Sequence, residues 1–133
     1  MKTLLLSAAL VMGAALPAQA QVAPSAAEAA TYQGLHAAAH KGDLGAIKQL
    51  IAAKADLNAR DPYGRTPLHV ASFARHREAI RLLAAAGADL NLLERDRYDT
   101  VTIASVADDE DTLRLLLSLG ASAKQVTSRY DGT

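Results

Sequence analysis

The sequence predicts an all-α fold, a solenoid of about three stacked helix-turn-helix units with short β-turn fingers. The first observation behind this prediction is a repeated motif. Residues 64–71 (GRTPLHVA) have diluted copies at the same interval on each side, at 35–38 and 101–104. A fixed period of about 33 residues is typical of stacked repeats, not of a single core with one active site. Two further observations agree with it: turn residues open each unit, and apolar residues at helical spacing follow them.

Residues 1–20 are expected to be a secretory signal peptide, with cleavage between Ala20 and Gln21. Lys2 supplies the positive start, residues 4–16 form an apolar or small-residue run, and a small-x-small cleavage site follows. A membrane anchor is the alternative, but the run is shorter than the ~20 apolar residues that a membrane span needs. The expected location is therefore the periplasm, or outside the cell. The chain has no Cys, which excludes lipid attachment through cysteine and disulfide bonds in that compartment.

The charge of the remaining chain argues against nucleic acid or an anionic membrane as a partner. One of the 14 basic residues is Lys2, so residues 21–133 carry 13 Lys and Arg against 14 Asp and Glu, a net charge of −1. Both of those partners require a basic surface. With one Phe and no Trp, Ala and Leu must fill the interior, which suits closely packed small helices.

Residues 21–31 precede the repeats and are either a linker or a short leading helix. The segment is rich in alanine, and Ser25 and Glu28 have the spacing of a capping box, which can start a helical turn. The composition alone suits a linker equally well, so both interpretations stay open.

Three units follow, at 32–60, 61–93 and 94–125. Residues 35–59 and 68–92 are identical at 12 of 25 aligned positions, and residues 68–92 and 101–125 at 8 of 25. The matched residues include Leu, Ile, His, Asp, Asn, Arg and Gly, so the abundance of alanine does not explain them. The third unit is the most diverged of the three.

The second unit shows the expected layout most clearly. Thr66 can cap its first helix, and Pro67 suits the first helical position, where a missing N–H costs nothing. A break is expected near Arg75 and a second helix after it, ending at Gly87, which suits a left-handed cap. Equivalent breaks are expected at Gly42 and Asp108, and an equivalent end at Gly120. The first unit has Lys54 at the end position, which should weaken that cap.

These residues resemble the ankyrin repeat. Its hallmark run matches Gly64-x-Thr66-Pro67-Leu68-His69-x-Ala71, and its second-helix ending matches residues 87–91 (GADLN). The third unit lacks the Thr-Pro-Leu-His run, so its first helix is less well specified. The resemblance implies stacked helix-turn-helix units with projecting fingers and a protein-binding role. It also implies that His69, and His36 at the aligned position, form hydrogen bonds between neighbouring loops.

The resemblance further implies that a protein partner binds the concave side, formed by finger tips and the exposed side of each first helix. Phe73 and the finger tyrosines are the aromatic candidates for interface anchors. For Phe73 and Val106, packing between repeats is an equally good interpretation. Carried over by position, the partner-binding residues are His40, Lys41, Tyr63, Arg65, Val70, Phe73, Ala74, Arg97, Tyr98, Ile103 and Val106.

The sequence contains no recognisable catalytic or metal site. His36 and His40 have the spacing of half a zinc site, but a carboxylate or Cys ligand to complete it is not apparent. No Gly-x-Ser-x-Gly elbow and no glycine-rich phosphate loop is present. We expect no catalytic residues, no metal and no cofactor, and therefore no enzyme.

Charges in the inter-helix loops predict a contact between the second and third units. Arg75 and Arg77 occupy the same loop positions as residues 108–110 (DDE), one repeat period later. Stacking places equivalent loops side by side, so the opposite charges should face each other. Two separately solvated loops are the alternative.

Residues 126–133 look like the start of a fourth repeat. The apolar helix expected at 113–119 has no successor, so the chain is expected to be a fragment of a longer array, or else a partner or another copy covers that face. The function expected is an exported protein-binding module. The alternatives are a structural or protective scaffold for a periplasmic enzyme and a secreted effector that binds host proteins.

Overall fold

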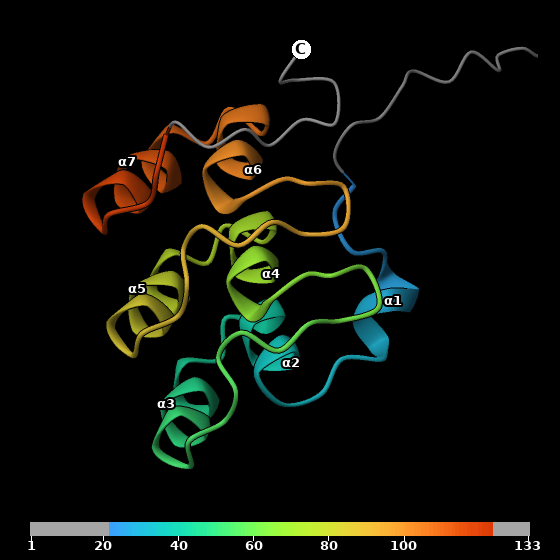
Figure 1. Cartoon of the computed structure of the whole chain (residues 1–133). Helices are drawn as coiled ribbons and strands as arrows, with labels where there is room; N and C mark the ends of the chain where they lie inside the picture. The colour runs from blue at the N-terminus through green and yellow to red at the C-terminus, as the bar shows by residue number, and fades with distance from the viewer. Residues whose placement is uncertain (1–21, 124–133) are drawn as a thin grey trace, which may run out of the picture.

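The computed structural model describes residues 22–123, and within this range it contains seven helices and no strand (Figure 1). The signal peptide predicted at 1–20 and the fourth-repeat start predicted at 126–133 lie outside these residues. The helices are α1 (Ala26–Ala30), α2 (Gly34–Lys41), α3 (Leu44–Ala52), α4 (Pro67–Phe73), α5 (Arg77–Ala85), α6 (Thr100–Val106) and α7 (Glu110–Ser118).

The helices form two layers, which confirms the predicted all-α solenoid. The first helices of the units, α2, α4 and α6, stack on one another, and the second helices, α3, α5 and α7, form the layer beside them. The loops that join successive units project to one side of the stack as fingers, and α1 lies at these fingers (Figure 1).

The cap of α4 has the predicted chemistry. The Thr66 side chain accepts a hydrogen bond from the His69 amide, the His69 ring accepts one from the Thr66 amide, and Pro67 stands at the start of the helix. In α6, Asp99 takes the position of Thr66, and its carboxylate accepts from the Thr102 amide at 2.8 Å. The third unit therefore has a different but equivalent cap, because a short acceptor side chain suffices at this position.

The left-handed positions recur with the period of the repeat. Gly42, Arg75 and Asp108 end the first helix of each unit with φ of 70°, 61° and 55°. At the ends of the second helices, Gly87 has φ of 108°, and Gly120 and Lys54 also have positive φ. Three of these positions carry a residue other than glycine, at a cost of ~1–2 kcal/mol each relative to a right-handed conformation.

The core runs through the whole stack between the two layers. Ile47, Ile80 and Leu116 of the second helices are fully buried, as is Leu68 of the motif. Alanines such as Ala71 are buried beside them. Their small side chains allow close approach of the helices, which agrees with a chain that has almost no large aromatic residues.

Candidate protein-binding surface

The second finger is a tight turn organised by one carboxylate. Asp61 Oδ1 accepts hydrogen bonds from the amides of Tyr63 and Arg65, each at 2.8 Å. The Asp61 amide in turn donates to the Arg65 carbonyl at 2.9 Å. These bonds hold the ends of the turn together and fix the direction in which Tyr63 projects.

The third finger has the same design with Glu in place of Asp. Glu94 Oε1 accepts from the amides of Asp96 at 2.7 Å and Tyr98 at 3.1 Å. Burial raises the pKa of the Glu94 carboxyl, although the two amide bonds oppose this change. Arg97 stands at the position of Gly64, and both residues have left-handed backbone conformations, with φ of 71° and 73°. The two turns therefore have the same backbone shape at this position.

Side chains that bond to backbone carbonyls tie the loops of the stack to neighbouring helices and loops. His36 Nε2 lies 2.8 Å from the Arg65 carbonyl oxygen, and His69 Nε2 lies 2.9 Å from that of Leu92. Arg60 donates to the carbonyls of Gly64 and Leu93, at 2.8 and 2.6 Å. These contacts confirm the loop-bridging role that the resemblance implies for the two histidines.

His69 is a structural residue rather than an acid or base. Its ring is buried, and burial lowers its pKa to about 4. The neutral ring satisfies both of its nitrogens, since Nδ1 accepts from the Thr66 amide and Nε2 donates to the Leu92 carbonyl. A charged ring would lose the acceptor at Nδ1, so the cap requires the neutral form, whereas the Nε2–H bond to Leu92 is available to either form.

Tyr63 lies between two guanidinium groups at the finger surface. The Arg65 guanidinium carbon is 4.6 Å from the centre of the Tyr63 ring, and that of Arg95 is 5.6 Å away. The Phe73 ring lies 5.9 Å from the Arg65 guanidinium carbon. Arg65 therefore lies between the finger aromatic and the last residue of α4.

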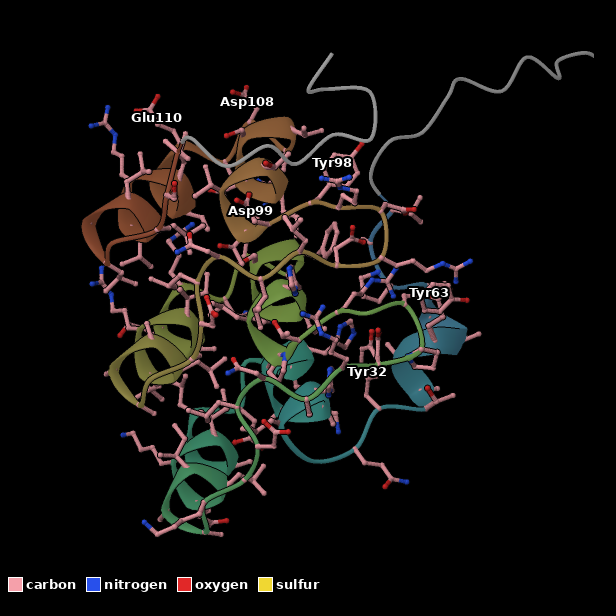
Figure 2. All side chains as sticks on the ribbon, in the orientation of Figure 1. Tyr32, Tyr63, Tyr98, Asp99, Asp108 and Glu110 are labelled. Atoms are coloured by element: carbon pink, nitrogen blue, oxygen red, sulfur yellow. The ribbon has the colours of Figure 1, made fainter. Side chains whose placement is uncertain are left out.

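The leading segment, residues 22–31, folds back across this face. Glu28 Oε1 lies 3.0 Å from Arg65 Nη1, and the Val22 carbonyl oxygen accepts from Arg65 Nη2 at 2.9 Å. Beside it, the Tyr32 hydroxyl donates to Asp61 Oδ2 at 2.6 Å. Figure 2 shows Tyr32 and Tyr63 on the finger side of the molecule, beside α1.

Sequence reasoning missed the contacts of Val22, Glu28 and Tyr32. The available signal was the Ser25–Glu28 capping box, which the structure contains in full, with both reciprocal hydrogen bonds around α1. The capping box predicts a helical turn but does not indicate where that turn docks. The pKa of Tyr32 is raised to about 12, mainly because its hydroxyl is buried and also because that hydroxyl donates to Asp61.

Three of the predicted partner-binding residues are buried, and their assignment to an open surface was wrong. Val70 and Ile103 are 0% and 1% exposed, at equivalent positions of α4 and α6, where they pack inside the stack. Arg65 is 3% exposed because its own finger and the leading segment cover it. A family resemblance assigns roles to aligned positions. It does not show which of those residues are covered by segments outside the repeats.

The other predicted residues reach the surface. Lys41, Arg97 and Val106 are exposed, and Val106 at 61% does not pack between the described repeats. Phe73 is half-buried against Arg65, so it has both a packed and an open side. The remaining residues are also half-buried: His40, Tyr63, Ala74 and Tyr98.

Comparison with known families agrees with the two-layer stack and its fingers. A family model for ankyrin repeats matches three copies over residues 35–127. The chain belongs to the ankyrin-repeat family. Ankyrin repeats serve in general as protein-interaction modules and are typically not catalytic. No curated protein matches the chain.

The edge of the ankyrin stack opposite the fingers contains the predicted charge contact. Asp109 Oδ1 lies 3.5 Å from Arg77 Nη1, and Asp109 Oδ2 lies 3.8 Å from Arg75 Nε. Arg75 also donates to the Ala107 carbonyl at 3.1 Å. The two loops therefore face each other as predicted, with Asp109 buried and its neighbours Asp108 and Glu110 exposed (Figure 2).

Neither a metal centre nor a membrane span is present among residues 22–123. No three His, Asp or Glu side chains of this range gather as metal ligands, and no helix in it has the length and apolarity needed to cross a membrane. His36 and His40, which have the spacing of half a zinc site, lie beside Tyr32, with their rings 5.3 and 6.2 Å from its ring.

Proposed function

We propose that this ankyrin-repeat protein is an exported, non-catalytic module that binds a protein partner in the periplasm or outside the cell. The observation that carries the proposal is the pair of finger tyrosines, Tyr63 and Tyr98, presented by two turns of the same design. Phe73 and Arg97 extend the same surface, which we call the finger face.

Two physical features support the finger face as the binding surface. Tyrosine, phenylalanine and arginine are the side chains most often found as anchors at protein interfaces. The turns that present them are already held by Asp61 and Glu94, and by bonds to the next repeat. Binding to such a preformed surface costs little ordering entropy, so a modest contact area can give useful affinity.

Export is the second component of the proposal and rests on residues 1–20. A positive start, an apolar run and a small-x-small ending agree with a signal peptide. Because the described fold needs no disulfide and the chain has no Cys, it can form in an oxidising compartment without oxidative folding steps.

Capture of partners from the periplasmic fraction of the source organism tests the proposal. Immobilised wild-type protein should retain a defined protein, and Tyr98→Ala combined with Phe73→Ala should lose it while the melting temperature stays within a few degrees of wild type. Arg81→Ala, on the exposed side of α5, is the matched control and should retain the partner. If the double variant binds as well as wild type, the finger face is not the binding surface.

A further inference from the structure

The finger face of the second repeat is already occupied by the chain itself. The leading segment supplies Glu28 and the Val22 carbonyl to Arg65, and together with Tyr63 it leaves Arg65 3% exposed. A partner that binds Arg65 must therefore displace this segment or bind beside it.

The contacts that hold the leading segment are polar and few. No residue of α1 is buried, and its five residues are too short for a helix that is stable by itself. The segment joins the repeats through Gly34, where φ is 55° and no atom lies within 4 Å of an added Cβ. The hydrophobic core, which includes Ile47 of the first repeat, contains no residue of the segment.

We propose that residues 22–31 are an internal ligand, and that the Arg65 site binds an acidic peptide segment of the partner protein in their place. This proposal rests on the proposed function, since it names the chemistry that the finger face takes. The leading segment would then act as a competitor that the partner must replace.

The charge of Arg65 determines what can replace the segment. When the segment leaves, the Arg65 guanidinium is uncovered and keeps Asp61 Oδ2 and the Tyr32 hydroxyl as neighbours, each 3.5 Å from Nη1. Arg65 Nε is already buried without a hydrogen-bond partner among the described residues. The groups that the segment places on Arg65 are a carboxylate and a backbone carbonyl, and a peptide containing Asp or Glu provides both.

The internal ligand itself indicates the shape of that peptide. A hollow of about 300 Å³ lies between the segment and the second finger, lined by Ala27 and Thr31 of the segment and by Pro62 of the finger. Alanines flank Glu28 on both sides in the internal ligand. The matching peptide has one acidic side chain between small residues, since large neighbours would keep its carboxylate away from Arg65.

A synthetic peptide can test the exchange without the natural partner. The probe is a fluorescein-labelled copy of residues 22–31 (VAPSAAEAAT), and its control has Gln at the position of Glu28. The proteins are the full chain and its variants Glu28→Lys, Glu28→Gln and, as matched control, Glu78→Lys on α5. In wild type the tethered segment competes at an effective concentration on the order of millimolar, which the variants at Glu28 should remove.

Fluorescence anisotropy should show the acidic peptide binding at least tenfold more tightly to Glu28→Lys than to wild type or Glu78→Lys. Glu28→Gln should lie between them, and the Gln peptide should bind at least tenfold more weakly to every protein. Equal affinity for all four proteins, or no binding to folded Glu28→Lys and Glu28→Gln, would overturn the proposal. Because no natural partner is involved, this result is independent of partner capture, which tests the proposed function.

Discussion

His69 shows how a single buried ring gives the fold a pH dependence. The pKa of His69 is about 4 in the fold, against 6.5 when the chain is unfolded, so the unfolded chain binds the proton more strongly. The stability that this difference provides is complete above pH 6.5 and decreases as the pH falls toward 4. A difference of this size corresponds to about 3 kcal/mol over the whole interval.

Denaturant unfolding at pH 7 and pH 5 should show this effect as a loss of about 2 kcal/mol at the lower pH. His69→Gln is the control: it should be less stable than wild type at pH 7 by about 1–3 kcal/mol and should have a much smaller difference between the two pH values. An unchanged pH dependence in this variant would show that other groups cause it.

Two carboxylates, Asp61 in the second finger and Asp109 in an inter-helix loop, also make the fold less stable as the pH falls, at lower pH than His69 does. Burial would raise the pKa of Asp61, but hydrogen bonds from Tyr32 and the finger amides lower it overall. For Asp109, burial is likewise outweighed by hydrogen bonds from Thr112 and by the nearby arginines, so its pKa is also lowered. A lowered pKa means stability that is present above the unfolded value and lost as pH falls through the folded value, so both groups favour acid unfolding.

The sequence predicts the architectural residues better than the exposed ones. Thr66, Pro67 and His69 act through a helix cap and a bridge to the neighbouring loop, and the repeat motif encodes both. The exposure of Arg65 depends on Glu28 and Val22, which lie 37 and 43 positions earlier in the chain, in a segment without a counterpart in the other units. No periodic pattern contains such a contact.

At the scale of the helix, the end of α3 is the weakest of the three second-helix ends. Lys54 has φ of 63° at the position where Gly87 and Gly120 stand in the next units. Lys54→Gly should therefore stabilise the protein by about 0.5–1 kcal/mol, because glycine adopts this conformation without steric cost. Chemical denaturation measures the change, with Gly87→Ala as the opposite variant, which should lose about 1 kcal/mol. Stabilisation by Gly87→Ala would contradict this account of the cap.

The loops after α4 and α6 give a prediction about salt. Reversing Arg75 and Arg77 to Glu places two like charges beside Asp109 and should lower the melting temperature by a few degrees at low salt. Each original pair is worth only ~0–1 kcal/mol because both arginines are about half exposed. At about 1 M salt most of the difference should disappear. An equal loss at both salt concentrations would show that packing, and not charge, causes it.

At the scale of the whole molecule, the repeat period predicts the layered stack because each unit packs only against its neighbours. Local signals, repeated three times, are then enough to determine the architecture. The sequence does not decide whether the leading segment is a linker or a helix, because its composition suits both and its docking depends on tertiary contacts to Arg65. The finger turns could therefore be predicted from the sequence, but not the segment that lies against them.

Hydrogen-exchange mass spectrometry of the protein, alone and with its captured partner, tests the central claim most directly. If the finger face binds the partner, amides of the second and third fingers, at 61–66 and 94–99, should exchange more slowly in the complex, while those of α3 and α5 stay unchanged. The leading segment at 22–31 should exchange faster if the partner displaces it. Protection confined to the second helices, with both fingers unchanged, would contradict the account.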